Sequence, residues 1–260
     1  MPETVSRSSR TAASTGCQPP APAPGPRSRT ITAPPQPRRF RSRIGVGAAS
    51  GFYPAPRRYD LFLCASCPRS LRISITLDLL GLRQSVATTL LTSLAATPDG
   101  YAELHRAYET TVHHFDGPLA APALRDRWSG RIVSNHTPDI LRDLAGSLAG
   151  EEGAQHAPLR PPRLVADIEA LSTLLDRDVT PAARPSARQA ALALLDRGLA
   201  RHPYALGTEL TAADVDVWVA LVRLDRDELR CASPRLGDYV RRLGDRPAFR
   251  SAIKTMYDAA

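Results

Sequence analysis

The hydrophobic pattern of the chain changes once, near residue 149, and this change constrains the fold more than any other feature. From Arg57 to Leu148, short apolar runs of strand length alternate with segments of helical periodicity. After a linker rich in Gly, Glu and Pro at 149–162, the strand-like runs stop and helical patterns continue to the end. The pattern therefore predicts an α/β domain at 57–148 followed by an all-α domain at 163–260.

The order of elements within 57–148 is that of a thioredoxin-like domain. The predicted strands cover 58–63, 86–91, 121–125 and 131–134. The predicted helices between and after them cover 68–80, 101–110 and 137–148. A Ser-Gly turn at 129–130 joins the last two strands as a hairpin. The second domain is predicted to hold helices at 165–175, 187–200, 215–224, 235–243 and 247–257. A capping box at Thr211 and Asp214 opens the almost entirely apolar segment 215–224, which is expected to be a central, buried helix.

The first 56 residues are expected to be mostly disordered. Residues 1–58 hold eleven of the 24 prolines and few apolar side chains. Burial of so little apolar surface would not offset the entropy lost on ordering the segment. Their ten arginines and single acid give +9, and the remaining 202 residues sum to −1. A nucleic-acid-binding body would carry its positive charge on the folded part, so no nucleic-acid partner is expected. A targeting segment and an over-extended start are alternatives for this tail.

Neither a membrane nor a metal is an expected partner. No apolar run is long enough to cross a bilayer, and a cytoplasmic location is predicted. The four cysteines, at positions 17, 64, 67 and 231, form neither a disulfide framework nor a zinc-site spacing. The adjacent His113 and His114 would point to opposite sides of a strand, which makes them a poor pair of ligands.

Cys67 is the predicted nucleophile. It follows a predicted strand and precedes a helix that opens with Pro68, whose missing N–H costs nothing at the first helical position. A thiolate there is stabilised by unpaired backbone N–H groups and by the positive end of the helix dipole. The alternative is an inert, buried cysteine. Cys64 completes a CxxC pair, and is interpreted as a strand residue, with a resolving role as the alternative.

Two further segments suggest a binding site. Ala121-Pro122 stands where thioredoxin-like proteins keep a cis-proline, so the Ala121 backbone could pair with the cysteinyl part of a thiol. The alternative is a trans proline that begins an edge strand. The Thr137-Pro138-Asp139 run is interpreted as N-cap, N1 and N2 of the next helix, whose free N–H groups could hold a carboxylate. Ordinary capping without a ligand is the alternative.

Five stretches resemble the glutathionyl-hydroquinone reductases, the Xi-class glutathione transferases. They are residues 40–45, 52–61, 57–72, 108–144 and 204–225, which occur in the family's order. The resemblance implies a glutathione-transferase fold, a homodimer, and glutathione or another low-molecular-weight thiol as cosubstrate, without a metal. It implies that Cys67 attacks the sulfur of a glutathionylated quinol, or of a related hydrophobic electrophile, and that a second thiol resolves the mixed disulfide. The chain would be a divergent member of the family.

The resemblance also assigns thiol-binding positions and shows where the chain departs from the family. Arg69 replaces a tryptophan of the family's Cys-Pro-Trp-Ala, and His136 with Thr137 replaces a Glu-Ser pair that binds the γ-glutamyl group. A thiol-contacting arginine falls at His105, next to Arg106. The thiol-binding residues implied are Arg69, Arg106, Ala121, Pro122, His136 and Thr137. A family tyrosine falls at Asp176, so the quinol-binding side of the site differs most.

These features support two hypotheses of different class. The first is a thiol-dependent reductase or transferase that uses Cys67. Because His136 removes the carboxylate that would meet the γ-glutamyl ammonium, a thiol without that group, such as mycothiol, is an alternative cosubstrate. The second hypothesis is a non-catalytic binding or scaffold protein that keeps the fold. Transfer chemistry through Ser66 or Ser70 is a third and weaker reading, because a better nucleophile lies beside them.

Overall fold

The computed structural model describes residues 37–45, 51–65, 67–150, 158–225, 227–229 and 233–257. All of them belong to one compact unit, Pro35–Ala260. The strands are β1 (Tyr59–Cys64), β2 (Ala87–Leu91), β3 (Ala123–Asp126) and β4 (Ile132–Ser134). The helices are α1 (Pro68–Leu79), α2 (Pro98–Thr111), α3 (Thr137–Ala145), α5 (Val165–Asp178), α6 (Pro185–Leu199), α7 (Ala212–Leu221), α9 (Pro234–Gly244) and α10 (Pro247–Tyr257), with 3-10 turns η2 (Leu82–Gln84) and η3 (Pro162–Leu164). The predicted fold class, thioredoxin-like and then all-helical, is confirmed.

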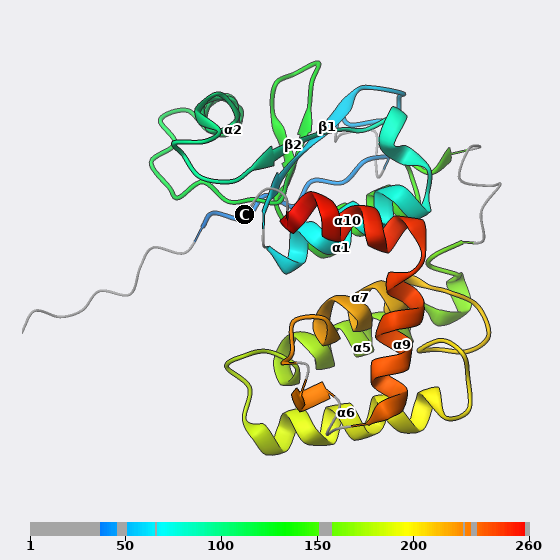
Figure 1. Cartoon of the computed structure of the whole chain (residues 1–260). Coiled ribbons are helices and arrows are strands. Elements are labelled where there is room, and N and C mark those ends of the chain that lie inside the picture. Colours follow the sequence, from blue (N-terminus) through cyan, green and yellow to red (C-terminus); the bar gives the residue numbers. More distant parts are fainter. Residues whose placement is uncertain are drawn as a thin grey trace, which may run out of the picture. The chain divides into compact units, whose positions relative to one another are not determined.

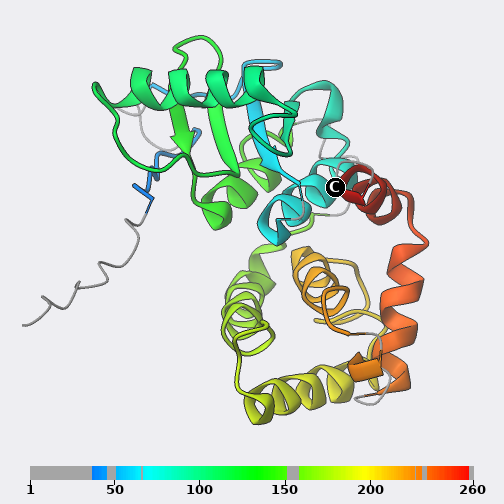
Figure 2. The same cartoon turned by 60° about the vertical axis from the view of Figure 1, so that its left-hand side comes forward.

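The sheet has the strand order β2-β1-β3-β4. β1 is parallel to β2 and antiparallel to β3, and β3 is antiparallel to β4. Alternate β1 side chains face opposite sides, as a period of two requires: Leu61 and Leu63 join the core beneath α1 and α3, whereas Phe62 joins the core beneath α2. Figure 2 shows α2 along one face of the sheet and α1 on the other.

Helix α1 is buried along most of its length and belongs to two hydrophobic cores, the one that it shares with β1 and α3 and the one of the later helices. Ile73 and Leu77 pack in the sheet core, and Leu71 and Ile75 pack in the core of the later helices. Its neighbours are α3, α7 and α10, and α10 lies beside it in both views (Figure 1). The helix that begins after Cys67 is therefore held from two sides.

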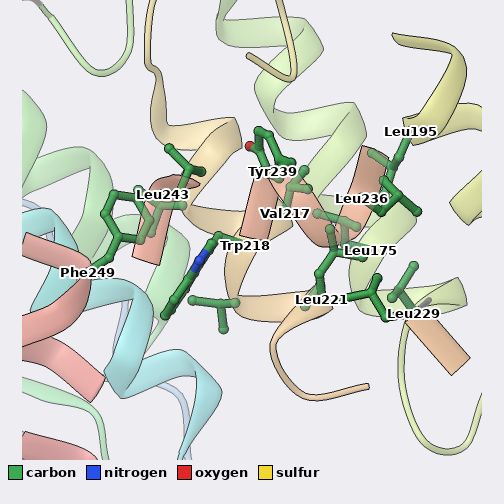
Figure 3. Packing of buried hydrophobic residues seen from close by; sticks show 14 of the residues in the cluster. Leu175, Leu195, Val217, Trp218, Leu221, Leu229, Leu236, Tyr239, Leu243 and Phe249 are labelled. Atoms are coloured by element: carbon green, nitrogen blue, oxygen red, sulfur yellow. The ribbon is translucent and has the colours of Figure 1, made fainter. Parts of the chain in front are cut away.

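Helix α7 is the centre of the helical region, as its sequence predicts. Every residue from Ala213 to Leu221 is buried, and the capping box of Thr211 and Asp214 is formed. Trp218 lies against Phe249 with the ring centroids 5.1 Å apart, and its indole N–H donates to the Val240 carbonyl (Figure 3). The interior of the second half is thus built around this helix.

The packed body begins earlier than the boundary expected at residue 57. The Ser42 N–H donates to the Val133 carbonyl, and Ile44 is fully buried. Arg43 forms an ion pair of 2.6 Å with the buried Asp143 of α3. Residues 37–45 therefore add an edge segment beside β4, because their few apolar side chains and arginines find partners about a hundred positions later. The cysteines at 17 and 231 and Ser66 lie outside the described residues.

Two local predictions are wrong. The N-cap of α3 is His136 and not Thr137, and the helix ends at Ala145 and not at residue 148. His113 and His114 lie in the turn after α2 with ring centroids 3.9 Å apart, and do not point to opposite sides of a strand. No helix among the described residues is long and apolar enough to cross a membrane.

Candidate functional site

Cys67 stands where β1 has ended and α1 begins. It is the N-cap of α1, in extended conformation, and Pro68 occupies the first helical position. Its carbonyl accepts the first helical hydrogen bond, from the Leu71 N–H at 3.0 Å. The thiol is free and partly exposed. This is the position that the sequence predicts, and in it a thiolate meets the positive end of the helix dipole.

Cys64 and Ser70 support this turn and are less suited to nucleophilic chemistry. Burial raises the pKa of the Cys64 thiol, and the neighbouring Cys67 raises it further. Cys64 is also a free thiol, so the CxxC pair is not closed into a disulfide. The Cys64 N–H donates to the hydroxyl oxygen of the fully buried Ser70 at 2.9 Å, which ties the strand end to the first turn of α1. Ser70 is therefore a structural residue.

A cavity of about 510 Å³ lies beside the first turns of α1. Its walls come from residues 37–39, from α1, from the segments around Ala121 and Thr137, and from α5 and α7. The charged residues of the lining are Arg39, Arg69, Arg72, Arg142, Arg160, Glu169, Asp176 and Asp216. None of the described lining residues is Phe, Tyr or Trp. The charged part of the lining thus has five arginines against three carboxylates, beside apolar side chains such as those of Leu141 and Ile168.

Arg72 connects this cavity with the nucleophile. Its side chain is buried and lies 2.7 Å from the Asp176 carboxylate and 3.3 Å from that of Asp216. Although burial lowers the pKa of the Arg72 guanidinium, Asp216 and Asp176 outweigh it and keep the group charged. Cys67 is a further and smaller cause of the raised pKa of Arg72. Burial in turn raises the pKa of the Asp216 carboxyl.

The N-terminus of α3 forms another wall of the cavity, and Asp139 holds the charged side chains around it in place. This buried carboxylate lies 2.7 Å from Arg41, 2.9 Å from His136 Nδ1 and 2.9 Å from Arg142. Burial raises the pKa of Asp139, but the hydrogen bonds and charges of Arg41 and His136 outweigh it, so the net shift is downward. The buried hydroxyl of Thr137 has no hydrogen-bond partner among the described residues, which leaves it available to a ligand.

The structure brings some of the predicted site residues together and separates others. Arg69, Ala121, His136 and Thr137 all line the cavity. The Ala121–Pro122 peptide bond is cis, as expected, and Pro122 is buried behind Ala121. Cys67 lies two positions before Arg69 but is not among the lining residues. Arg106 is exposed on α2 and does not line the cavity either, so the structure does not place it in the site.

The sequence analysis missed several residues that shape this cavity. They are Arg39, Arg72, Arg142, Arg160, Glu169 and Asp216. Arg72 lies on α1 at a spacing of five from Cys67, which is not a helical neighbour position, so it carries no local signal in the sequence. The others carry none either, because arginine is abundant throughout the chain and their partners come from distant elements.

Comparisons with known proteins agree with this architecture. The glutathione S-transferase C-terminal domain model matches residues 181–242. The glutathionyl-hydroquinone reductase YqjG of Escherichia coli (strain K12) is 26% identical over 233 residues, which span 77% of this chain and 71% of that protein. The structure of the Xi glutathione S-transferase from Phanerochaete chrysosporium has a TM-score of 0.68 at 23% identity, with 87% and 92% of the two chains covered. The glutathione-bound structure of YqjG gives a TM-score of 0.66 at 22% identity, with coverages of 82% and 84%.

The sequence match and the shared fold relate the chain to the same group of proteins. The family model covers part of the helical region, whereas the reductase match and the structural likenesses extend over most of the chain. The glutathione-transferase fold is therefore common to all of them. The chain is a divergent relative of the glutathionyl-hydroquinone reductases, the Xi-class glutathione transferases.

Proposed function

We propose that this chain is a thiol-dependent reductase or transferase of glutathione-transferase type that works through Cys67. The observation that carries the proposal is the position of Cys67, a free and partly exposed thiol at the N-terminus of α1 next to an arginine-lined cavity. Its curated relatives are glutathionyl-hydroquinone reductases, which are enzymes of this type. The same likeness implies a cytoplasmic homodimer, which stays a prediction.

The cosubstrate would lie along the wall formed by Ala121 and the N-terminus of α3. The cysteinyl part of a thiol peptide would pair with the Ala121 backbone. A carboxylate of the peptide would accept hydrogen bonds from the first N–H groups of α3 and from the Thr137 hydroxyl. Both residues line the cavity, and the Thr137 hydroxyl is buried without a described partner. This placement would bring the thiol sulfur towards Cys67.

The proposed reaction is a two-electron reduction of a glutathionylated quinol. The Cys67 thiolate attacks the glutathionyl sulfur, so that a sulfur–sulfur bond forms and the ring carbon–sulfur bond breaks. The electron pair of the broken bond goes to the ring carbon, which takes up a proton. A second glutathione then attacks the mixed disulfide, releasing glutathione disulfide and restoring Cys67. Overall, one glutathionyl-quinol and one glutathione give one quinol and one glutathione disulfide.

The identity of the thiol depends on the position that His136 occupies. The nearest carboxylate, Asp139, is already engaged by His136, Arg41 and Arg142, and does not offer a free partner to the γ-glutamyl ammonium. Glutathione is the cosubstrate that the relatives favour, and mycothiol is the alternative that this geometry favours. Calorimetric titration of the reduced protein with each thiol decides between them. Tight glutathione binding without a response to mycothiol would exclude the alternative.

Mass spectrometry of the intact protein tests the nucleophile. After incubation with glutathione disulfide, or with the oxidised form of the other thiol, we expect one adduct, and peptide mapping should place it on Cys67. Cys67→Ser should abolish the adduct and the reduction of glutathionylated quinols. Cys64→Ser is the matched control, since it removes the neighbouring thiol and should leave both intact. Unchanged activity in Cys67→Ser would exclude Cys67 as the nucleophile. An unmodified Cys67 in a wild type that does not reduce glutathionylated quinols would favour the non-catalytic binding protein.

A further inference from the structure

Two of the cavity's arginines have side chains without a partner among the residues that the structure describes. Arg72, Arg142 and Arg160 are each held by a carboxylate, at distances of 2.7, 2.8 and 3.0 Å. Arg39 and Arg69 also line the cavity, yet neither forms an ion pair or hydrogen bond with another described residue. Both side chains are exposed to solvent. The cavity therefore presents two uncompensated positive charges to whatever enters it.

The rest of the lining is suited to a charged ligand as well. Arg72 is only 7% exposed, and its Nε makes no hydrogen bond to a described residue, although Asp216 lies nearby. The described lining lacks Phe, Tyr and Trp, so a neutral aromatic ring would find no aromatic partner. Arginine recognises carboxylates through paired N–H donors. Polar donors and uncompensated cations in one cavity point to an anion.

We propose that the group which Cys67 exchanges carries a fixed negative charge, such as a carboxylate on the aromatic ring, and that Arg69 binds this anion with Arg39 beside it. This inference rests on the proposed function and narrows its substrate from quinols in general to acidic ones. Arg69 is the primary determinant because it lies two positions after Cys67, on the first turn of α1. Its charge already reaches the CxxC segment, since it lowers the pKa of Cys64 against the effect of burial.

A carboxylate could also come from the thiol peptide itself, and the experiment separates the two sources. The probes are two glutathione thioethers of hydroquinone, one with an unsubstituted ring and one with a ring carboxylate. Wild-type kcat/KM is expected to favour the acidic ring by on the order of tenfold. Arg69→Met, which keeps length but removes charge, should lower kcat/KM for the acidic ring by on the order of tenfold more than for the unsubstituted ring. Arg69→Lys should retain most of the preference, and added salt should reduce it.

The matched control is Arg197→Met, because Arg197 is an exposed arginine on α6 that does not line the cavity. Arg197→Met should leave kcat/KM unchanged for both thioether probes. Equal wild-type rates for the two probes would overturn the inference. An equal loss for both probes in Arg69→Met would also overturn it, since Arg69 would then hold the peptide's own carboxylate.

A binding measurement keeps this inference separate from the proposed reaction. Calorimetric titration with the free ring acid, dihydroxybenzoate, should show binding to the wild type and at least tenfold weaker binding to Arg69→Met. Unsubstituted hydroquinone should bind to Arg69→Met with the same affinity as to the wild type. Failure of the proposed function would appear as the absence of a Cys67 adduct, whereas equal binding of the acidic and neutral rings would refute the anion site.

Discussion

At the scale of the residue, Cys67 depends on charges that lie outside its own turn. Its helix position provides a partial positive charge, and the buried guanidinium of Arg72 adds another, which the carboxylates of Asp176 and Asp216 fix in place and partly offset. A buried charge is poorly screened, so it acts on its neighbours more strongly than a surface charge does. We therefore propose that the reactivity of Cys67 depends on this buried cation as well as on the end of the helix.

Removing that cation should slow the chemistry of the thiol. We expect Arg72→Met to alkylate with iodoacetamide at Cys67 on the order of fivefold more slowly at pH 7 than the wild type. Arg72→Lys keeps a positive charge and should recover part of the rate. Since removing one member of a buried ion pair can cost about 3–5 kcal/mol of stability, urea unfolding should confirm that each variant is folded. An unchanged alkylation rate in folded Arg72→Met would contradict the electrostatic role.

Asp139 should make the free energy of unfolding depend on pH in the acidic range. Its pKa in the folded protein is lowered, so its stabilisation is fully present above the unfolded pKa of about 3.9 and is lost as the pH falls through the folded value. We expect Asp139→Asn to reduce the free energy of unfolding by about 2 kcal/mol at pH 7. The difference from the wild type should shrink as both proteins are acidified towards pH 2, measured by urea unfolding. Asp238→Asn, at an exposed pair with Arg241, should change little at either pH.

At the scale of the element, α7 shows how a short polar cap fixes a buried helix. Asp214 accepts hydrogen bonds from the Thr211 N–H at 2.8 Å, the Ala205 N–H at 2.7 Å and the Tyr239 hydroxyl at 2.7 Å. Burial raises the pKa of this carboxyl despite these bonds. The cap therefore joins the start of α7 to the preceding loop and to α9.

Substitution of the two capping-box residues should lower the free energy of unfolding by different amounts. Thr211→Ala removes one cap and should cost about 1 kcal/mol of unfolding free energy. Asp214→Ala leaves four donors, the N–H and hydroxyl of Thr211, the Ala205 N–H and the Tyr239 hydroxyl, without their acceptor, and should cost about 3 kcal/mol. Tyr239→Phe, which removes only one of these donors, serves as the intermediate variant at about 1 kcal/mol. Equal effects of Thr211→Ala and Asp214→Ala in urea unfolding would show that the contacts to Ala205 and Tyr239 contribute nothing.

At the scale of the whole molecule, α1 makes the two predicted domains depend on each other. Its residues belong to the sheet core on one side and to the helical core on the other. Neither half can bury its apolar surface when α1 is displaced. We therefore propose that 57–148 and 163–260, although they are separate domains in topology, fold and unfold together as one cooperative unit.

The two tryptophans allow this proposal to be tested. Trp128 is 63% exposed at the β3–β4 turn, whereas Trp218 is 1% exposed in the helical core. In Trp218→Phe the remaining fluorescence reports on the sheet half, and in Trp128→Phe it reports on the helical half. We expect each variant's fluorescence transition in urea to coincide with its own transition by circular dichroism. Two separated transitions would mean that the halves unfold independently.

Much of the fold was predictable because its signals are local. The alternation of strand and helix before residue 149, the cap at Thr211 and the helix start at Cys67 each depend on neighbours within a few positions. The strand end, Cys67 and Pro68 also located the proposed nucleophile. The edge segment 37–45 was missed because its composition resembles a disordered tail, and it is ordered only by contacts such as that of Arg43 with Asp143.

The sequence by itself therefore determined the order of elements, the two-part architecture and the position of the thiol. Only the tertiary structure decided the character of the cavity beside that thiol. Arg72 meets Asp176 across 104 positions of sequence, and Arg41 meets Asp139 across 98. With 33 arginines in the chain, nothing in the sequence distinguishes those that find a carboxylate from Arg69, which has none among the described residues. The physical reason is that charge pairing depends on distance in space, which is fixed only when both cores close around α1.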